Sequence, residues 1–226
     1  MNFSAANLSG ANFTGAWMGN VNLSNANLSK ANLTDTKLKG SNLQGAKLNK
    51  VTISGADLSF VKGGVSSGGL NGAPAYLPTG YAIINGYLLS PGANLVGANL
   101  AGANLAFPMN LSGAVMDSSN LVGANLRGAT LTGASLVNVN FTNSLSCNLV
   151  ANNANLSGAN FTGAQLLSAY LKGAKVNGAN FGSSQMSNIL SGGVTGTPAS
   201  LPIGVSIIGG KFTYDESFEG SNYCNS

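Results

Sequence analysis

The chain has 226 residues, of which 44% are hydrophobic and only 7% charged, and its formal net charge is +4. It contains no histidine and only six carboxylates, which excludes a Ser-His-Asp triad and a zinc site with histidine ligands. The hydrophobic content argues against a disordered polar chain, and the mild positive charge lacks the basic clusters of a nucleic-acid module. We therefore expect a folded chain with no catalytic residues, no cofactor, no metal site and no nucleic-acid partner.

Residues 1–60 form a first repeat array, in which a large apolar residue recurs at every fifth position. A small residue, usually alanine, stands two positions before nearly every one of them, and asparagine is usual between the two. The large residues are Phe3, Leu8, Phe13, Met18, Leu23, Leu28, Leu33, Leu38, Leu43, Leu48, Ile53 and Leu58.

A period of five fits neither a helix nor a strand, because their side-chain periods are about 3.6 and 2. It indicates a chain that turns a corner once per repeat, so that four repeats close one coil of about 20 residues. The large and the small residue then point inward, while glycine and asparagine suit the corners because both tolerate turn conformations. Coils are expected to stack at roughly 4.8 Å, with outward asparagines forming hydrogen-bonded ladders between them.

Residues 61–92 interrupt the period and are interpreted as an insert. Its segment 81–89 is apolar and β-prone, and Gly80 and Pro91 bound it, so it is predicted to be a strand. The insert is expected to pack against the coils or to cover an open end, and the alternative is a docking surface. The aromatic residues that we select as candidate interaction sites are Tyr76, Tyr81 and Tyr87.

Residues 93–188 form a second array with the same period. One residue is added near Phe107-Pro108, and two weak repeats, with Ser146 and Ala151 at the large position, keep the register. Both arrays together predict roughly eight coils at the strand spacing.

Residues 189–214 are a second copy of the insert, because residues 72–86 and 196–210 match at a constant offset along the chain. Residues 215–226 are either a tail or the start of a further, degenerate array. Three acidic residues lie close together in this last segment, Asp215, Glu216 and Glu219, and a solvated acidic tail is the preferred interpretation over a cation site.

The repeated Ala-Asn-Leu pattern, as in Ala6-Asn7-Leu8 and Ala26-Asn27-Leu28, resembles the pentapeptide-repeat family, whose consensus is A-(D/N)-L-x-x. The resemblance implies an all-β fold, a right-handed quadrilateral parallel β-helix, here with two non-repeat inserts. Some members of this family mimic duplex DNA and protect gyrase. That activity needs an acidic surface, which this chain lacks.

Few side chains suggest a binding site. Lys30 and Lys50 are expected to stack one coil apart and to form a sparse basic face, and Lys37 is expected beside Asp57 as an exposed pair. A solvated surface is the preferred interpretation, with binding of an anionic polymer or a membrane surface as the alternative. Thr14, Thr34 and Ser54 form a hydroxyl column that could match ice. Cys147 and Cys224 can pair or remain free, and unpaired cysteines are favoured.

The leading hypothesis is a non-catalytic structural or scaffold protein that self-assembles, with the coil ends as assembly edges because both ends expose unpaired backbone. The alternative is an adaptor that binds another protein through the Pro/Gly inserts; gyrase protection and ice binding rank lower. The partner is therefore a protein or a second copy of the chain. There is no apolar stretch of about 18 residues, so no transmembrane segment is expected. No signal peptide is visible at the start, and a cytoplasmic, virion or surface location stays open.

Overall fold

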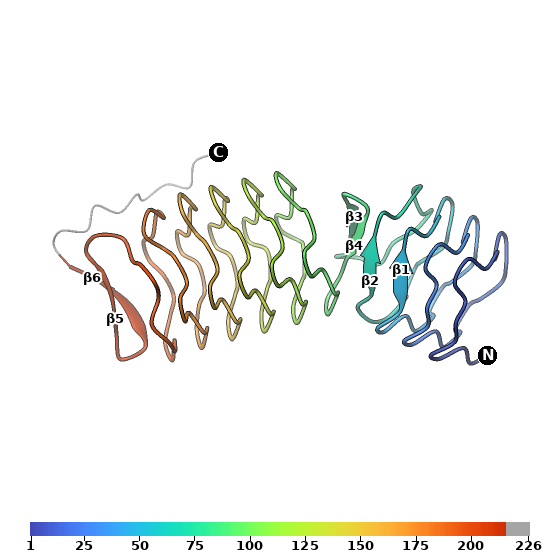
Figure 1. The fold of residues 1–226 in the computed structure, drawn as a ribbon, viewed down its shortest axis with the longest axis horizontal. Coiled ribbons are helices and arrows are strands. Elements are labelled where there is room, and N and C mark those ends of the chain that lie inside the picture. Colours follow the sequence, from blue (N-terminus) through green and yellow to red (C-terminus); the bar gives the residue numbers. More distant parts are fainter. Residues whose placement is uncertain (216–226) are drawn as a thin grey trace. The chain divides into compact units, whose positions relative to one another are not determined.

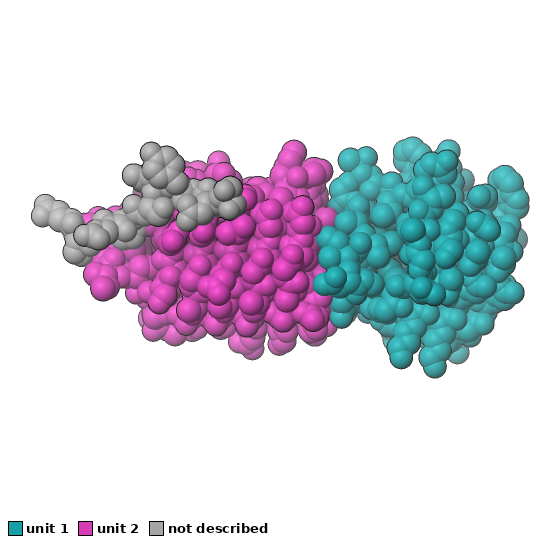
Figure 2. Space-filling model, turned by 90° about the horizontal axis from the view of Figure 1, so that it is seen from above, with its two compact units in different colours: residues 1–95 teal, residues 96–226 magenta. Residues whose placement is uncertain are grey.

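The computed structural model describes residues 1–215, which contain six short β-strands and no helix. The chain divides into two compact units, residues 1–95 and residues 96–226, coloured separately in Figure 2, and each is described by itself. Residues 216–226, which include Cys224 and most of the predicted degenerate array, lie outside the described part.

Unit 1 consists of stacked coils (Figure 1). Outward residues pair in parallel with residues 20 positions later, as Asn2 does with Asn22 and Asn22 does with Asn42. The backbone bonds follow the same register, because the N–H of Phe3 donates to the carbonyl of Asn22 at 2.7 Å. This register confirms that four repeats close one coil. Between stacked coils of unit 1, β1 (Lys47–Asn49) and β2 (Ser66–Gly68) form a regular strand pair, which is parallel.

Every fifth residue of the first array turns a corner in the left-handed region of backbone space. The φ angles of these twelve residues, from Ala5 to Phe60, lie between 56° and 73°. Seven of the twelve are glycine or asparagine, the two residue types that tolerate this conformation best. The corners therefore explain the spacing of these two residue types along the array.

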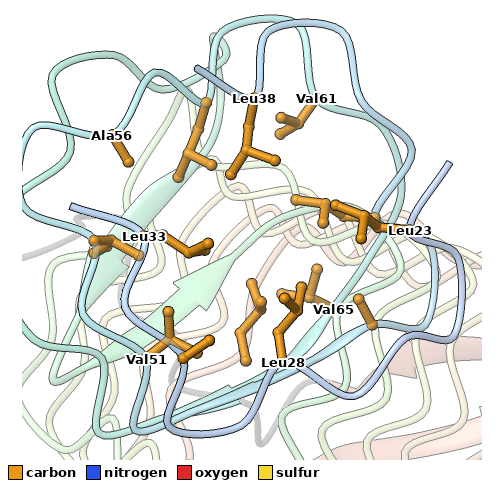
Figure 3. Packing of buried hydrophobic residues seen from close by; sticks show 14 of the residues in the cluster. Leu23, Leu28, Leu33, Leu38, Val51, Ala56, Val61 and Val65 are labelled. Carbon is orange, nitrogen blue, oxygen red and sulfur yellow. The ribbon is translucent and has the colours of Figure 1, made fainter. Parts of the chain in front are cut away.

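The core of unit 1 is the inside of the coils. Leu23, Leu28, Leu33 and Leu38 come from successive sides of one coil and are at most 1% exposed, and Figure 3 shows them pointing inward. At the two inward positions of the first array that carry a hydroxyl residue, Thr36 and Ser41, the hydroxyl is bonded. The hydroxyl of Ser41, for example, donates to the carbonyl of Met18 at 2.6 Å. The predicted inward pair of one large and one small residue is confirmed.

Coil pairing continues where the sequence period stops. Asp57 pairs with Tyr76, 19 positions later, and the coil then leaves the register through a hairpin of β3 (Ala82–Ile84) and β4 (Tyr87–Leu89). The prediction of one strand over residues 81–89 is therefore wrong. Asn85 and Gly86 have φ angles of 51° and 75° and form a tight turn, which is typical of an Asn-Gly hairpin.

Unit 2 repeats the coil architecture. Asn99 pairs with Asn120 at a spacing of 21, whereas Asn110 pairs with Thr130 at a spacing of 20, which confirms the extra residue near Phe107-Pro108. The weak repeats keep their inward orientation, because Ser146 and Ala151 are both fully buried. Cys147 is also buried and forms a disulfide bond, so the favoured prediction of an unpaired cysteine is wrong.

Stacked aromatic rings fill one column of unit 2. The rings of Phe141 and Phe161 are 4.6 Å apart and those of Phe161 and Phe181 are 4.9 Å apart, which is the coil spacing. A second hairpin, β5 (Val205–Ile208) and β6 (Lys211–Tyr214), lies at the end of these coils in Figure 1. Phe212 of β6 meets Phe181 edge-on at 5.7 Å, so this hairpin covers the end of the aromatic column.

Candidate functional site

Three of the four faces of unit 1 begin with an asparagine at the outward position: Asn2, Asn7 and Asn12. Each side-chain oxygen accepts the N–H two residues later, as Asn12 does from Thr14 at 3.1 Å. Asparagines of neighbouring coils also bond to each other, as the amide of Asn27 does to Asn7 at 3.4 Å. These bonds confirm the predicted ladders and give the asparagines a structural role.

The fourth face carries different residues, and we call it the Trp17 face. Its outward column is Trp17, Lys37, Asp57 and Tyr76, and each residue pairs with the next. The pairing of Lys37 with Asp57 confirms their predicted neighbourhood. Trp17 is 87% exposed and Tyr76 is 63% exposed. Neither a tryptophan nor a lysine side chain can accept the N–H that an asparagine accepts, so the first two coils lack this bond on the Trp17 face.

A shallow groove of about 780 Å³ crosses the Trp17 face, and we call it the Trp17 groove. Its lining is Trp17, Gly19, Asn20, Lys37, Lys39, Gly40, Asp57 and Phe60. The ammonium group of Lys39 lies 5.4 Å from the centre of the Phe60 ring, within cation–π range. The groove therefore combines two exposed aromatic rings with two cations.

Phe60 occupies a corner at which the two preceding coils have Asn20 and Gly40. Its φ angle is 57°, a costly conformation for a bulky side chain, and the ring is 68% exposed. An exposed ring gains little burial energy to offset this cost. Strained residues of this kind gather at binding sites, which makes the Trp17 groove the candidate functional site of unit 1.

The carboxylate of Asp57 is held inside the groove by its own coil. The hydroxyl of Ser59 donates to it at 2.6 Å and the N–H of Ser59 donates at 2.9 Å. These bonds, together with the charges of Lys39 and Lys37, lower the pKa of Asp57 and outweigh the opposing effect of burial. Asp57 thus stays ionised at neutral pH.

The first coil is the second feature of interest. In the next coil, the N–H groups of Asn22, Asn27 and Asn32 donate to carbonyls of the first coil. Among the described residues, no acceptor meets the equivalent N–H groups of the first coil, which belong to Asn2, Asn7, Asn12 and Trp17. This side of the coil is an unpaired edge.

Apolar side chains accompany the unpaired edge. Phe3, Leu8 and Phe13 are only partly buried, whereas the residues one coil behind them are at most 1% exposed. The edge therefore offers both backbone hydrogen-bonding groups and apolar surface. We call these residues, with the unpaired N–H groups, the first-coil edge.

The two hairpins are held in the same way. The N–H of Leu88 in β4 donates to the hydroxyl of Ser67 at 2.8 Å, and the N–H of Phe212 in β6 donates to that of Ser191 at 3.0 Å. Both pairs are separated by 21 residues, and corresponding members lie 124 residues apart, the offset of the two insert sequences. The two hairpins thus share one kind of anchoring bond.

The residues selected from the sequence lie in different places. Tyr76 belongs to the Trp17 face, whereas Tyr81 and Tyr87 are part of the first hairpin region and are half-buried. Burial raises the pKa of Tyr81, and a bond from Ser90 partly opposes this. Lys30 and Lys50 are exposed corner residues with positive φ, in the same coil position. Contact of these five residues with a partner stays a prediction.

Sequence reasoning missed the groove residues Trp17, Lys39 and Phe60. A signal was present, because Trp17 breaks the run of outward asparagines and Phe60 stands at a corner position. Among residues 1–215, no group of three or more potential metal ligands lies together. The same residues include no helix long and apolar enough to cross a membrane.

The profile for pentapeptide repeats matches eight copies in this chain, at residues 1–25, 26–59, 110–145 and 151–188. These ranges cover more than half of the sequence. The chain belongs to the pentapeptide repeat family. Its fold is accordingly the right-handed parallel β-helix that the resemblance implied.

Several solved structures are similar to this pentapeptide repeat protein. HetL, a pentapeptide repeat protein involved in heterocyst differentiation regulation from the cyanobacterium Nostoc sp. strain PCC 7120, is 23% identical, with 94% of this chain and 92% of that chain covered and a TM-score of 0.30. QnrB1, a plasmid-mediated fluoroquinolone resistance protein, is 16% identical, with 87% and 79% covered and a TM-score of 0.36.

A third structure, Rfr23 from the cyanobacterium Cyanothece 51142, is 27% identical, with 47% of this chain and 89% of that chain covered and a TM-score of 0.26. No curated protein sequence matches the chain. Because all these TM-scores are low, no property of the three proteins is transferred to this one.

Proposed function

We propose that this pentapeptide repeat protein is a non-catalytic scaffold that self-associates through the first-coil edge. The observation that carries the proposal is the combination of unpaired backbone N–H groups with the half-buried side chains of Phe3, Leu8 and Phe13. An exposed strand edge is a template for pairing with another chain, and apolar surface adds the driving force of burial. A second copy offers the same edge.

The expected assembly is a dimer. In unit 2 the β5–β6 hairpin covers the end of the aromatic column through Phe212, so the same kind of contact is blocked there. Two copies that meet through one identical edge form a closed, two-fold contact, which does not grow further. A filament built from coil ends alone is therefore not expected.

The mass of the full chain should rise from one to two copies over about a hundredfold range of concentration. We suggest measuring it by light scattering coupled to gel filtration in about 1 M salt, where ion pairs between copies are screened. Leu8→Glu places a charge in the coil edge and should weaken the dimer at least about tenfold, because the contact would bury that charge.

Ser4→Glu is the matched control, since it adds the same charge to an exposed position of the same coil. It should leave the dimer intact, and circular dichroism should show both variants folded. A mass of one copy at every concentration would disprove the proposal, as would a dimer that survives Leu8→Glu unchanged.

The adaptor alternative has weaker support from the geometry. Tyr81 and Tyr87 are half-buried, and the N–H of Leu88 is bonded to Ser67, so the first hairpin is engaged with its own coils. The ice-binding alternative meets a similar difficulty. The hydroxyls of Thr14 and Thr34 donate to the side chains of Asn12 and Asn32 at 2.6 Å and are already engaged.

A further inference from the structure

We propose that the Trp17 groove binds the acidic segment 215–219 of a second copy of this chain. The proposal deepens the proposed self-association by naming a second contact. It rests on that function only for the identity of the partner. Leu8, which the test of the first-coil edge alters, is not part of the Trp17 groove.

The groove offers the chemistry of an acidic, aromatic ligand. Trp17 and Phe60 are largely exposed, and Lys37 and Lys39 belong to the same lining. Lys39 is an exposed residue, and its ammonium group lies over the Phe60 ring. A ligand that stacks an aromatic ring in this groove brings any flanking carboxylates close to these two cations.

The lining of the groove includes two glycines of neighbouring coils. Gly19 and Gly40 contribute no side chain of their own, and the side-chain oxygen of Asn20 occupies the space beside Gly40. On the other faces the outward positions of the first coil are occupied by bonded asparagines. The Trp17 face of unit 1 therefore combines a hollow with apolar walls.

The chain itself carries a matching segment. Its sequence is Asp215-Glu216-Ser217-Phe218-Glu219, which places one phenylalanine between carboxylates. These five residues hold three of the six carboxylates of the whole chain. In contrast, residues 1–95 hold six lysines and two aspartates, a net charge of +4 by the difference of these counts. The two charges are complementary, which favours this segment as the occupant.

Asp57 is the one carboxylate in the groove lining, and it opposes an acidic ligand. The two bonds from Ser59 and the neighbouring lysines stabilise its ionised form, so its negative charge persists. With Lys37 and Lys39 counted, the lining keeps a net charge of +1. The attraction is therefore modest, and the stacking of the phenylalanine contributes the remainder of the affinity.

This contact joins two different surfaces, a groove on one copy and a segment on the next. Such a contact is heterologous and can continue from copy to copy, unlike the closed contact of the first-coil edge. Together the two contacts would extend the scaffold beyond a dimer.

Trp17 is the only tryptophan of the chain and therefore reports directly on the groove. We suggest recording its emission in the full chain carrying Leu8→Glu, at low salt, over about a hundredfold range of concentration. A blue shift that grows with concentration is expected, because an entering ring removes water from the indole. The shift should disappear at high salt.

Two sets of variants decide the assignment. In the same background, Glu216→Gln with Phe218→Ala and Glu219→Gln should abolish the shift, and a synthetic peptide of residues 213–221 added to this variant should restore it. Lys37→Gln with Lys39→Gln should weaken peptide binding about five- to tenfold. Lys30→Gln with Lys50→Gln, which removes the same charge at corners outside the groove, is the matched control.

Three results would overturn the proposal: no shift with concentration or peptide, equal weakening by both lysine pairs, or a shift that persists in the triple variant of the segment. A shift that depends on the segment but not on concentration would mean that the segment binds the groove of its own copy. That result would overturn the proposal that it binds a second copy. Failure of the first-coil dimer leaves this readout unaffected, because the background lacks that contact.

Discussion

At the scale of single residues, the corners of neighbouring coils are coupled. In six places an asparagine or aspartate corner is followed, 20 residues later, by a glycine corner, as Asn143 is by Gly163. The side-chain oxygen of the first residue occupies the space where the second would carry a Cβ atom. Glycine is thus required there for two reasons, a positive φ and a lack of space.

Replacing Gly163 by alanine should cost more than replacing Gly133. Both corners have φ near +67°, so both variants should lose about 1 kcal/mol of unfolding free energy from backbone strain. Only Gly163→Ala also meets the side chain of Asn143, which should add about 1–2 kcal/mol. Urea unfolding measures both losses.

A double variant isolates the coupling. Asn143→Gly removes the obstructing side chain, so Gly163→Ala in this background should cost only the strain contribution. Equal losses for Gly133→Ala and Gly163→Ala would contradict the coupling.

At the scale of elements, the two hairpins share one anchoring bond but pack against different parts of their units. In unit 1 the β3–β4 hairpin adds eight residues, 82–89, to a coil, and Asn94 then pairs with Ser66 at a spacing of 28. In unit 2 the β5–β6 hairpin covers an aromatic column through Phe212. The serine that bonds each hairpin is the shared anchor.

Ser67→Ala and Ser191→Ala should each destabilise the protein by about 1–3 kcal/mol. In each variant a buried N–H, of Leu88 or of Phe212, loses its acceptor. Thermal unfolding provides the measurement. Ser66→Ala is the control, because this neighbour faces outward and should change stability by less than about 0.5 kcal/mol. A loss confined to one hairpin would show that the two are not equivalent.

At the scale of the whole molecule, the charge composition predicts an unusual pH dependence. The chain has no histidine. The pKa of Asp57 is lowered and the pKa values of Tyr81 and Tyr214 are raised, so all three are shifted away from neutral pH. The pKa of Asp57 is lowered, so its contribution to stability is present above the unfolded value of about 4 and is lost as the pH falls through the folded value.

Tyr81 and Tyr214 behave in the opposite sense. Burial raises the pKa of both, so their contribution is present below the unfolded value of about 10 and is lost as the pH rises through the folded values. Chemical unfolding should therefore give a nearly constant free energy between about pH 6 and pH 8, with losses in acid and in strong alkali. A transition centred in the neutral range would contradict this expectation.

The period of five determined the fold of both units without any tertiary information. Each repeat specifies its own turn, its own inward pair and its own outward residue, so local residues suffice to define the coil. The extra residue near Phe107-Pro108 and the weak repeats at Ser146 and Ala151 were predicted for the same reason, because stacked coils preserve register. The detailed division into two arrays, two inserts and a tail stays a prediction.

The hairpins and the Trp17 groove were decided by the tertiary structure. The strand prediction for residues 81–89 failed because it weighed apolar content and overlooked the Asn85-Gly86 turn signal. The groove could not be predicted from residues that are close in the sequence. Trp17, Lys39 and Phe60 lie about 20 residues apart and come together only through the register of the stacked coils. A repeat of five residues encodes the coil locally, whereas a binding surface depends on which coils are stacked, and stacking is a long-range property of the fold.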